Sequence, residues 1–115
     1  IRLDSAYALA YFNRGVSYHR MSEYQLAIDE YTHSIRIDPE YAPVYYNRAL
    51  AHANMGNYQL AIDDFNQAIR IDPENGIYYY LRQNAHRALG NLEQADADYT
   101  EAARLDPNLV DEEEQ

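Results

Sequence analysis

A thirteen-residue segment that ends in Asp-Pro occurs three times in the chain at constant spacing. Its copies read AIDEYTHSIRIDP (27–39), AIDDFNQAIRIDP (61–73) and ADADYTEAARLDP (95–107). The closing prolines Pro39, Pro73 and Pro107 are 34 residues apart. Such spacing is typical of a repeat array, in which each unit is one small motif that stacks on its neighbours. The sequence therefore predicts three units, at 8–41, 42–75 and 76–109.

Each unit contains two helical patterns separated by a short turn. In the second half of the middle unit, apolar residues fall at three- and four-residue steps on one helical face: Ala61, Ile62, Phe65, Ala68 and Ile69. Proline ends each second helix because its ring fixes φ and clashes with the preceding turn. We expect first helices at 7–20, 42–54 and 77–88, and second helices at 24–37, 58–71 and 92–105. The predicted fold is all-α, with about six helices in antiparallel pairs.

Residues at fixed offsets give the chain a resemblance to the tetratricopeptide repeat (TPR) family over nearly its whole length. The matching residues are Tyr11, Tyr45 and Tyr79; Gly15 and Ala49; Tyr18, His52 and His86; Ala27, Ala61 and Ala95; Tyr31, Phe65 and Tyr99; and Ser34, Ala68 and Ala102. The departures are Gln83 in place of a small residue, Ser22 in place of the turn glycine, and Arg14, Arg48 and Arg82 where the family often has leucine. The resemblance implies a right-handed superhelical solenoid.

The two ends of the chain depart from the repeat pattern. Residues 1–6 (IRLDSA) align with 35–40 (IRIDPE), with Ser5 in the place of Pro39. We therefore expect residues 1–7 to be the tail of a preceding repeat, or a linker, and the chain to be part of a longer array. Chance similarity is the alternative. Residues 110–115 are expected to be an acidic tail or the start of a polar capping helix.

Composition excludes several classes of function. The formal net charge of −10 disfavours nucleic acid and anionic membranes as partners. There is no cysteine, and the four histidines lack the i, i+4 spacing of a helical metal pair. No nucleophile elbow, phosphate loop or cofactor fingerprint is present. We therefore expect a protein with no catalytic residues, no metal and no cofactor, and we favour the cytoplasm as its location.

The resemblance implies that the first helix of each unit lines a concave groove in which extended peptides lie. Carried over by position, the candidate peptide-binding residues are Phe12, Asn13, Val16, Tyr46, Asn47, Leu50, Tyr80, Leu81, Asn84 and Arg87. Asparagine amides can donate to and accept from a peptide backbone, and aromatic rings add apolar contact area. Alternatively, the same aromatic residues pack between adjacent helices. We expect a protein-interaction module. The second hypothesis is a structural segment that self-assembles through its end faces.

Chaperone-binding members of the family hold a peptide carboxylate in a clamp of lysine, asparagine and arginine side chains. At the corresponding positions this chain has Phe12, Val16, Asn47, Ile77 and Leu81, and only Asn47 matches. The sequence therefore predicts that the acidic tails of heat-shock chaperones are not partners.

The recurrence of Arg14, Arg48 and Arg82 at one offset predicts a structural role, in which they pair with carboxylates of the second helices such as Asp29, Asp63 or Asp64.

Overall fold

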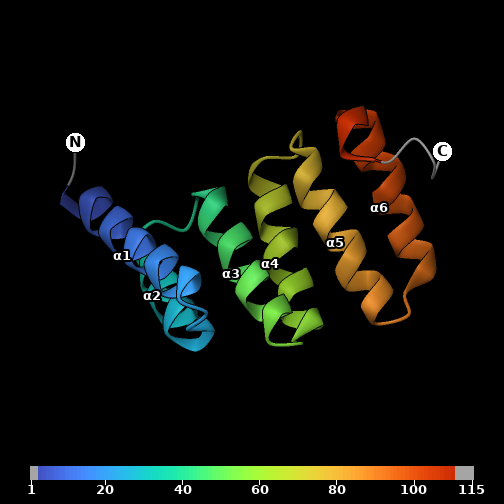
Figure 1. Cartoon of the computed structure of the whole chain (residues 1–115). Helices are drawn as coiled ribbons and strands as arrows, with labels where there is room; N and C mark the ends of the chain where they lie inside the picture. Colours follow the sequence, from blue (N-terminus) through green and yellow to red (C-terminus); the bar gives the residue numbers. More distant parts are fainter. Residues whose placement is uncertain (1–2, 111–115) are drawn as a thin grey trace.

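The computed structural model describes residues 3–110 of the chain. They form six α-helices and a short 3-10 helix: α1 (Leu3–Arg20), α2 (Tyr24–Ile37), α3 (Ala42–Asn54), α4 (Tyr58–Ile71), α5 (Gly76–Ala88), α6 (Leu92–Leu105) and η1 (Pro107–Leu109). The helices follow one another along the molecule in sequence order (Figure 1). The predicted all-α fold is confirmed, and five of the six predicted helices agree with the observed bounds to within one residue.

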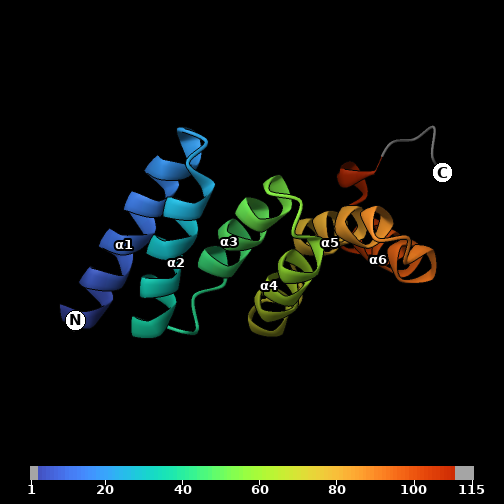
Figure 2. The same cartoon turned by 90° about the horizontal axis from the view of Figure 1, so that it is seen from below.

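The helices pair as three hairpins, α1 with α2, α3 with α4 and α5 with α6. The hairpins are joined through the second helix of one pair, which packs on the first helix of the next. Figure 2 shows the same stack of pairs from below. The result is an elongated solenoid that measures 46 × 29 × 20 Å.

Two local signals end the helices. Each hairpin turn contains a residue with positive φ, at Ser22 (60°), Gly56 (79°) and Gly90 (81°). Serine therefore adopts at the first turn a conformation that glycine adopts with less strain. Each second helix is followed by an aspartate and then a proline. At the end of α2, for example, the backbone of Asp38 is extended (φ −134°, ψ 92°) because the ring of Pro39 disfavours helical geometry at the residue before it.

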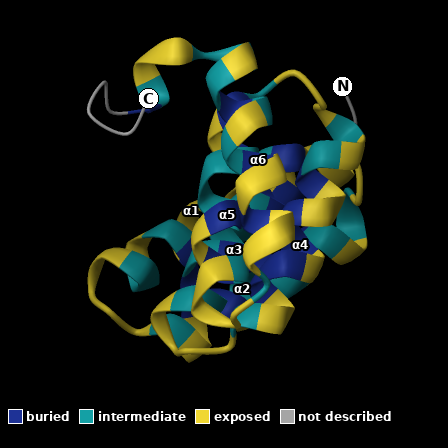
Figure 3. Ribbon diagram, turned by 90° about the vertical axis from the view of Figure 1, so that its right-hand side faces the viewer, coloured by how far each residue is buried: buried dark blue, intermediate teal, exposed yellow. Residues whose placement is uncertain are grey.

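Small residues and one large aromatic ring fill the interior of each hairpin. Ala27, Ala61 and Ala95 have no exposed surface, and Tyr31 and Phe65 occupy the same position in the first two units with 0% and 1% exposed. Tyr31 lies so close to Gly15 that a Cβ atom there would come within 2.5 Å of its ring. Figure 3 shows the buried residues (dark blue) inside the stack and the exposed residues (yellow) on its outer surfaces and turns.

Both ends of the described chain differ from the prediction. Residues 3–7 belong to α1, so this helix begins four residues before the predicted start at residue 7, because Ser5 does not end a helix as Pro39 does. The assignment of residues 1–7 to a preceding repeat or a linker stays a prediction. At the other end Val110 is buried, so the tail does not begin at residue 110 as predicted. The prediction of a solvated run or capping helix from Asp111 to Glu114 lies outside the described residues.

Candidate peptide-binding face

The first helices of the three pairs form a surface that we call the helix A face, made by α1, α3 and α5. Apart from Asp4 near the start of α1, these three helices contain no carboxylate. They contain five arginines: Arg14, Arg20, Arg48, Arg82 and Arg87. The carboxylates of the described chain therefore lie mainly on α2, α4, α6 and the loops, and Arg14, Arg48, Arg82 and Arg87 each pair with one of them.

At the first junction between units, Phe12 and Val16 pack against a cluster that contains Tyr31 and Val44. The ring of Phe12 lies 6.0 Å from that of Tyr31 and meets the ring of Tyr41 edge-on at 5.8 Å. Phe12 and Val16 are half-buried, whereas Asn13, another of the predicted peptide-binding residues, is exposed. Phe12 thus contributes to packing between units and keeps part of its surface accessible.

At the second junction, Tyr46 has the same role. Its ring centroid lies 6.5 Å from that of Phe65 and 5.4 Å from that of Tyr78. Burial raises the pKa of Tyr46. Its neighbour Asn47 donates from Nδ2 to the carbonyl oxygen of Pro43 at 2.8 Å, so one amide donor is used within the helix. The packing alternative that the sequence left open therefore describes part of what Phe12 and Tyr46 do.

Three of the predicted residues, Leu50, Leu81 and Asn84, meet at an apolar cavity of about 250 Å³ between α3 and α5. The residues that complete its lining were not predicted: Ala53, Tyr58, Phe65, Ala85 and Ala88. A signal for two of them is present in the sequence, because alanine at the twelfth and thirteenth positions of a unit (Ala53 and Ala88) leaves space between adjacent first helices. The cavity is large enough for one apolar side chain.

The remaining predicted residues lie at the C-terminal end of the helix A face. Tyr80 is half-buried and Arg87 is exposed. Arg87 donates from Nε to Oε1 of Gln83 at 3.0 Å and from Nη2 to Oδ1 of Asp96 at 3.0 Å. Gln83 is buried and also donates to the carbonyl oxygen of Tyr80 at 3.3 Å. The large side chain at this normally small position is thus satisfied by hydrogen bonds.

The recurrent arginines form ion pairs between the two helices of each hairpin. Arg48 donates to both carboxylate oxygens of Asp64 at 2.8 Å. Arg82 forms the same bidentate pair with Asp98. In the first unit Arg14 binds Glu30 at 2.9 Å. The predicted structural pairing is confirmed. Asp64 is the partner found among the predicted carboxylates, whereas Asp29 and Asp63 accept hydrogen bonds from Gln25 and Gln59.

Two half-buried histidines lie beside these pairs. Nε2 of His52 is 3.9 Å from Oδ2 of Asp64, and Nε2 of His86 is 3.8 Å from Oδ2 of Asp98. Burial lowers the pKa of both imidazoles, and the nearby aspartates oppose that shift only in part. No group of three or more metal-ligating side chains occurs among residues 3–110. These histidines therefore belong to the packing between helices.

The fold and its helix A face define a class of protein: a solenoid of helix pairs that presents one continuous face of first helices. Two sequence profiles described as tetratricopeptide repeat match the chain, one at residues 8–41 and 42–75 and the other at 78–109. The chain belongs to the tetratricopeptide repeat family. No curated protein matches the sequence. In the part of the chain that the structure describes, no helix is long and apolar enough to cross a membrane.

Solved structures of TPR domains resemble nearly the whole chain. The first TPR of Spaghetti (RPAP3), bound to the HSP90 peptide SRMEEVD, is 33% identical with a TM-score of 0.88, and the match covers 94% of this chain and 86% of that one. The Arabidopsis OM64 TPR domain is 27% identical with a TM-score of 0.88, with coverage of 91% and 87%. The second TPR domain of human RPAP3, in complex with the HSP70 peptide SGPTIEEVD, is 30% identical with a TM-score of 0.87, covering 90% and 87%.

Two of these neighbours hold chaperone peptides. They oppose the prediction that chaperone tails are not partners of this chain. That prediction rested on the side chains at five clamp positions, and it did not consider the charge of the whole face. α3 and α5 themselves contain no carboxylate.

Proposed function

We propose that this chain is a protein-interaction module that binds an extended peptide along the helix A face. The preferred peptide combines one apolar side chain with acidic residues. The observation that carries the proposal is the apolar cavity between α3 and α5, which lies in a surface almost free of carboxylates. The peptides held by the structural neighbours, SRMEEVD and SGPTIEEVD, both combine apolar side chains with acidic residues.

Three features of the face support this choice of ligand. The exposed amides of Asn13 and Asn84 can bond to a peptide backbone without reading its sequence. Leu50 and Leu81 line the cavity and offer apolar contact to a side chain such as methionine or isoleucine. Arg87 retains donors at the end of the face and can attract a carboxylate.

The test is a fluorescence polarisation titration of labelled SRMEEVD, with a neutral peptide of the same length, in which glutamine and asparagine replace the acidic residues, as a reference. In Asn84→Asp a carboxylate replaces an amide at the rim of the cavity with almost no change in volume. The expected loss of affinity is about tenfold, because like charges repel in a partly desolvated site. The matched control is Gln94→Glu, which adds the same charge at an exposed position on α6.

Equal affinity of the wild type and Asn84→Asp for SRMEEVD would place the binding site away from the helix A face. If neither SRMEEVD nor SGPTIEEVD binds more tightly than the neutral peptide, the proposed ligand class is wrong.

A second candidate function is assembly through the N-terminal end of the solenoid. Ala10 of α1 occupies the position at which Val44 and Tyr78 are buried against a preceding unit, and Tyr7 beside it is 59% exposed. At the C-terminal end, by contrast, Val110 is buried and Leu109 lies against Gly76. Sedimentation velocity over a concentration series tests this function, and a monomer at every concentration would exclude self-assembly through that end.

A further inference from the structure

The outer face of α1, at the N-terminal end of the solenoid, has a shallow cavity of about 310 Å³. It is lined by four residues of this helix, Tyr7, Ala10, Tyr11 and Arg14. Ala10 is exposed, and Tyr7 is 59% exposed. The cavity is therefore open to a partner that approaches the end of the solenoid.

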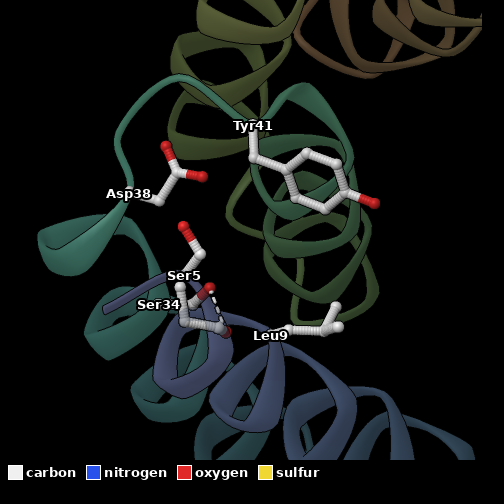
Figure 4. Close-up of a pocket in the computed structure, with 6 residues that line it drawn as sticks. Ser5, Leu9, Ser34, Asp38 and Tyr41 are labelled. Carbon is white, nitrogen blue, oxygen red and sulfur yellow. Dashed lines mark hydrogen bonds between the residues drawn. The ribbon is translucent and has the colours of Figure 1, made fainter. Parts of the chain in front are cut away.

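The inner face of α1 is fixed to the rest of its hairpin. Oγ of Ser34 donates to the carbonyl oxygen of Ala8 at 2.8 Å, and both residues are buried. Figure 4 shows this bond beside the pocket between the start of α1 and the loop before α3. The outer face thus belongs to a helix whose position is already determined by α2.

The equivalent face of the first helix is covered in the two later units, where α2 packs on α3 and α4 packs on α5. Nη1 of Arg48 donates to Oγ1 of Thr32 on α2 at 3.1 Å. Nη1 of Arg82 donates to Oδ1 of Asn66 on α4 at 2.8 Å. At each junction an arginine of the first helix therefore reaches a side-chain oxygen of the preceding second helix.

An apolar contact accompanies each of these hydrogen bonds, one helical turn before the arginine. Val44 is 0% exposed and packs against Tyr31 of α2. Tyr78 is 5% exposed and packs against Ala68 of α4. The preceding helix thus buries one apolar side chain of the first helix and accepts a hydrogen bond from one arginine.

In α1 the same two positions are held by Ala10 and Arg14, and no helix covers them among the described residues. The side chain of Arg14 is 59% exposed, whereas those of Arg48 and Arg82 are each 21% exposed. Arg14 donates from Nη2 to Glu30 within its own hairpin at 2.9 Å, and Nη1 has no acceptor in the described part of the chain. One half of a junction is therefore present at this end without its other half.

We propose that the outer face of α1 binds an amphipathic α-helix of a protein partner, with a threonine or asparagine at the centre of the helix face that meets α1. The side-chain oxygen of that residue accepts from Nη1 of Arg14, as Thr32 and Asn66 accept from the later arginines. A large apolar side chain of the partner fills the cavity over Ala10, because alanine is smaller than the valine and tyrosine at the equivalent positions. The proposal rests on the second candidate function in using the N-terminal end, and it is independent of peptide binding on the helix A face.

A second copy of this chain fits the outer face of α1 less well than a helix of another protein. Thr100 of α6 has the acceptor position, but the chain's own Val110 lies at the end of that helix. Val110 corresponds to Ala42 and Gly76, the first residues of α3 and α5, and like them it is buried. In a second copy α1 would have to displace Val110 in order to pack on α6 as α3 packs on α2.

The probe is the helix that covers α5, prepared as a stapled peptide of residues 58–71 in which the staple replaces the exposed Gln59 and Asp63. We expect this peptide to shift the backbone amide NMR signals of Ala10, Tyr11 and Arg14 saturably, with a Kd on the order of 0.1 mM. A second peptide with Asn66→Leu has nearly the same shape and no acceptor. It should bind about fivefold more weakly, because the hydrogen bond to a charged donor is lost.

Three variants of the protein complete the test, and all change exposed residues of α1. Arg14→Met removes the donor and should make the two peptides bind equally. Ala10→Glu places a carboxylate in the cavity and should weaken both peptides at least about tenfold. Arg20→Met is the control, because it removes the same charge from α1 outside the cavity, and both affinities should stay unchanged.

The absence of saturable shifts at Ala10, Tyr11 and Arg14 would overturn the proposal, and so would equal affinity of the two peptides for the wild type. Shifts that map to α3 and α5 would also refute it, because they would place the bound helix on the helix A face. If sedimentation shows a wild-type dimer that Ala10→Glu dissociates, the occupant is a second copy and the assignment to a different partner is wrong. The binding of SRMEEVD is measured separately with Asn84→Asp, so each proposal can hold or fail without the other.

Discussion

Replacing Tyr31 by phenylalanine should stabilise the protein. Tyr31 is 0% exposed, and its hydroxyl has no hydrogen-bond partner among the described residues. Burial raises the pKa of this phenol to about 12. A buried donor without a partner costs about 1–3 kcal/mol, because the group loses its bonds to water on folding. Tyr31→Phe removes that cost and keeps the ring.

The expected net gain is smaller than the full cost of the unpaired hydroxyl. Removing the oxygen also removes dispersion contacts that contribute about a few tenths of a kcal/mol. Phe65 fills the same position in the second unit with 1% exposed, so a phenylalanine ring fits between the helices of a pair. We therefore expect Tyr31→Phe to raise the free energy of unfolding by about 1 kcal/mol, and Tm by about 4 °C.

Urea unfolding followed by far-UV circular dichroism measures this difference, and the m-value should not change. The reciprocal variant Phe65→Tyr introduces an unpaired hydroxyl and should lower the free energy of unfolding by about 1–3 kcal/mol. A Tyr31→Phe variant with an unchanged or lower urea midpoint would refute the reasoning, since it would show that the hydroxyl of Tyr31 is hydrogen-bonded in solution.

Three further predictions concern packing, ion pairs and pH. Gly15→Ala should destabilise the protein by about 1–2 kcal/mol in urea unfolding, because a clash with Tyr31 outweighs the gain in helix propensity. An equally stable variant would show that the ring of Tyr31 moves freely. Arg48→Met should cost about 3 kcal/mol, since it leaves the carboxylate of Asp64, 5% exposed, without its cation. Arg14→Met, at the same position but 59% exposed, is the control and should leave Tm unchanged. The third prediction concerns three half-buried histidines, His19, His52 and His86. Burial lowers their pKa below 6.5 in the folded state, so the unfolded chain binds more protons and stability falls as the pH drops below about 6.5. Tm should decline from about pH 7.5 to 5.5, and a variant with all three changed to glutamine should decline less; parallel profiles would contradict the assignment.

The features that recur with the 34-residue period could be predicted from the sequence. The second helices begin and end where predicted, because the proline and the residues before it determine the end of each copy in the same way. The pairing of Arg48 with a carboxylate of α4 was also predictable, since an arginine at a recurrent position inside a helix pair needs a recurrent partner.

The features that were mispredicted or missed lie where one unit differs from the others. Residues 3–7 have the spacing of a repeat end, but Ser5 lacks the ring that stops a helix, so α1 begins at Leu3. The burial of Val110 depends on contacts of the C-terminal turn that no other unit contains. The cavity near Leu50 and Leu81 depends on the distance between α3 and α5, which sequence spacing alone does not give.

The same contrast separates the positions that hold each hairpin together from those that differ between the junctions. Positions that are alike in all units, such as Ala27, Ala61 and Ala95, are fully buried and hold each hairpin together. A change there alters stability, and it affects a ligand only through the fold. At the position of Val44 and Tyr78 both side chains are buried, yet Val44 packs against Ala27 and Tyr31 whereas Tyr78 packs against Ala42 and Ala68. Exchanging Val44 and Tyr78 between units should therefore change the packing at the two junctions and leave the helices in place.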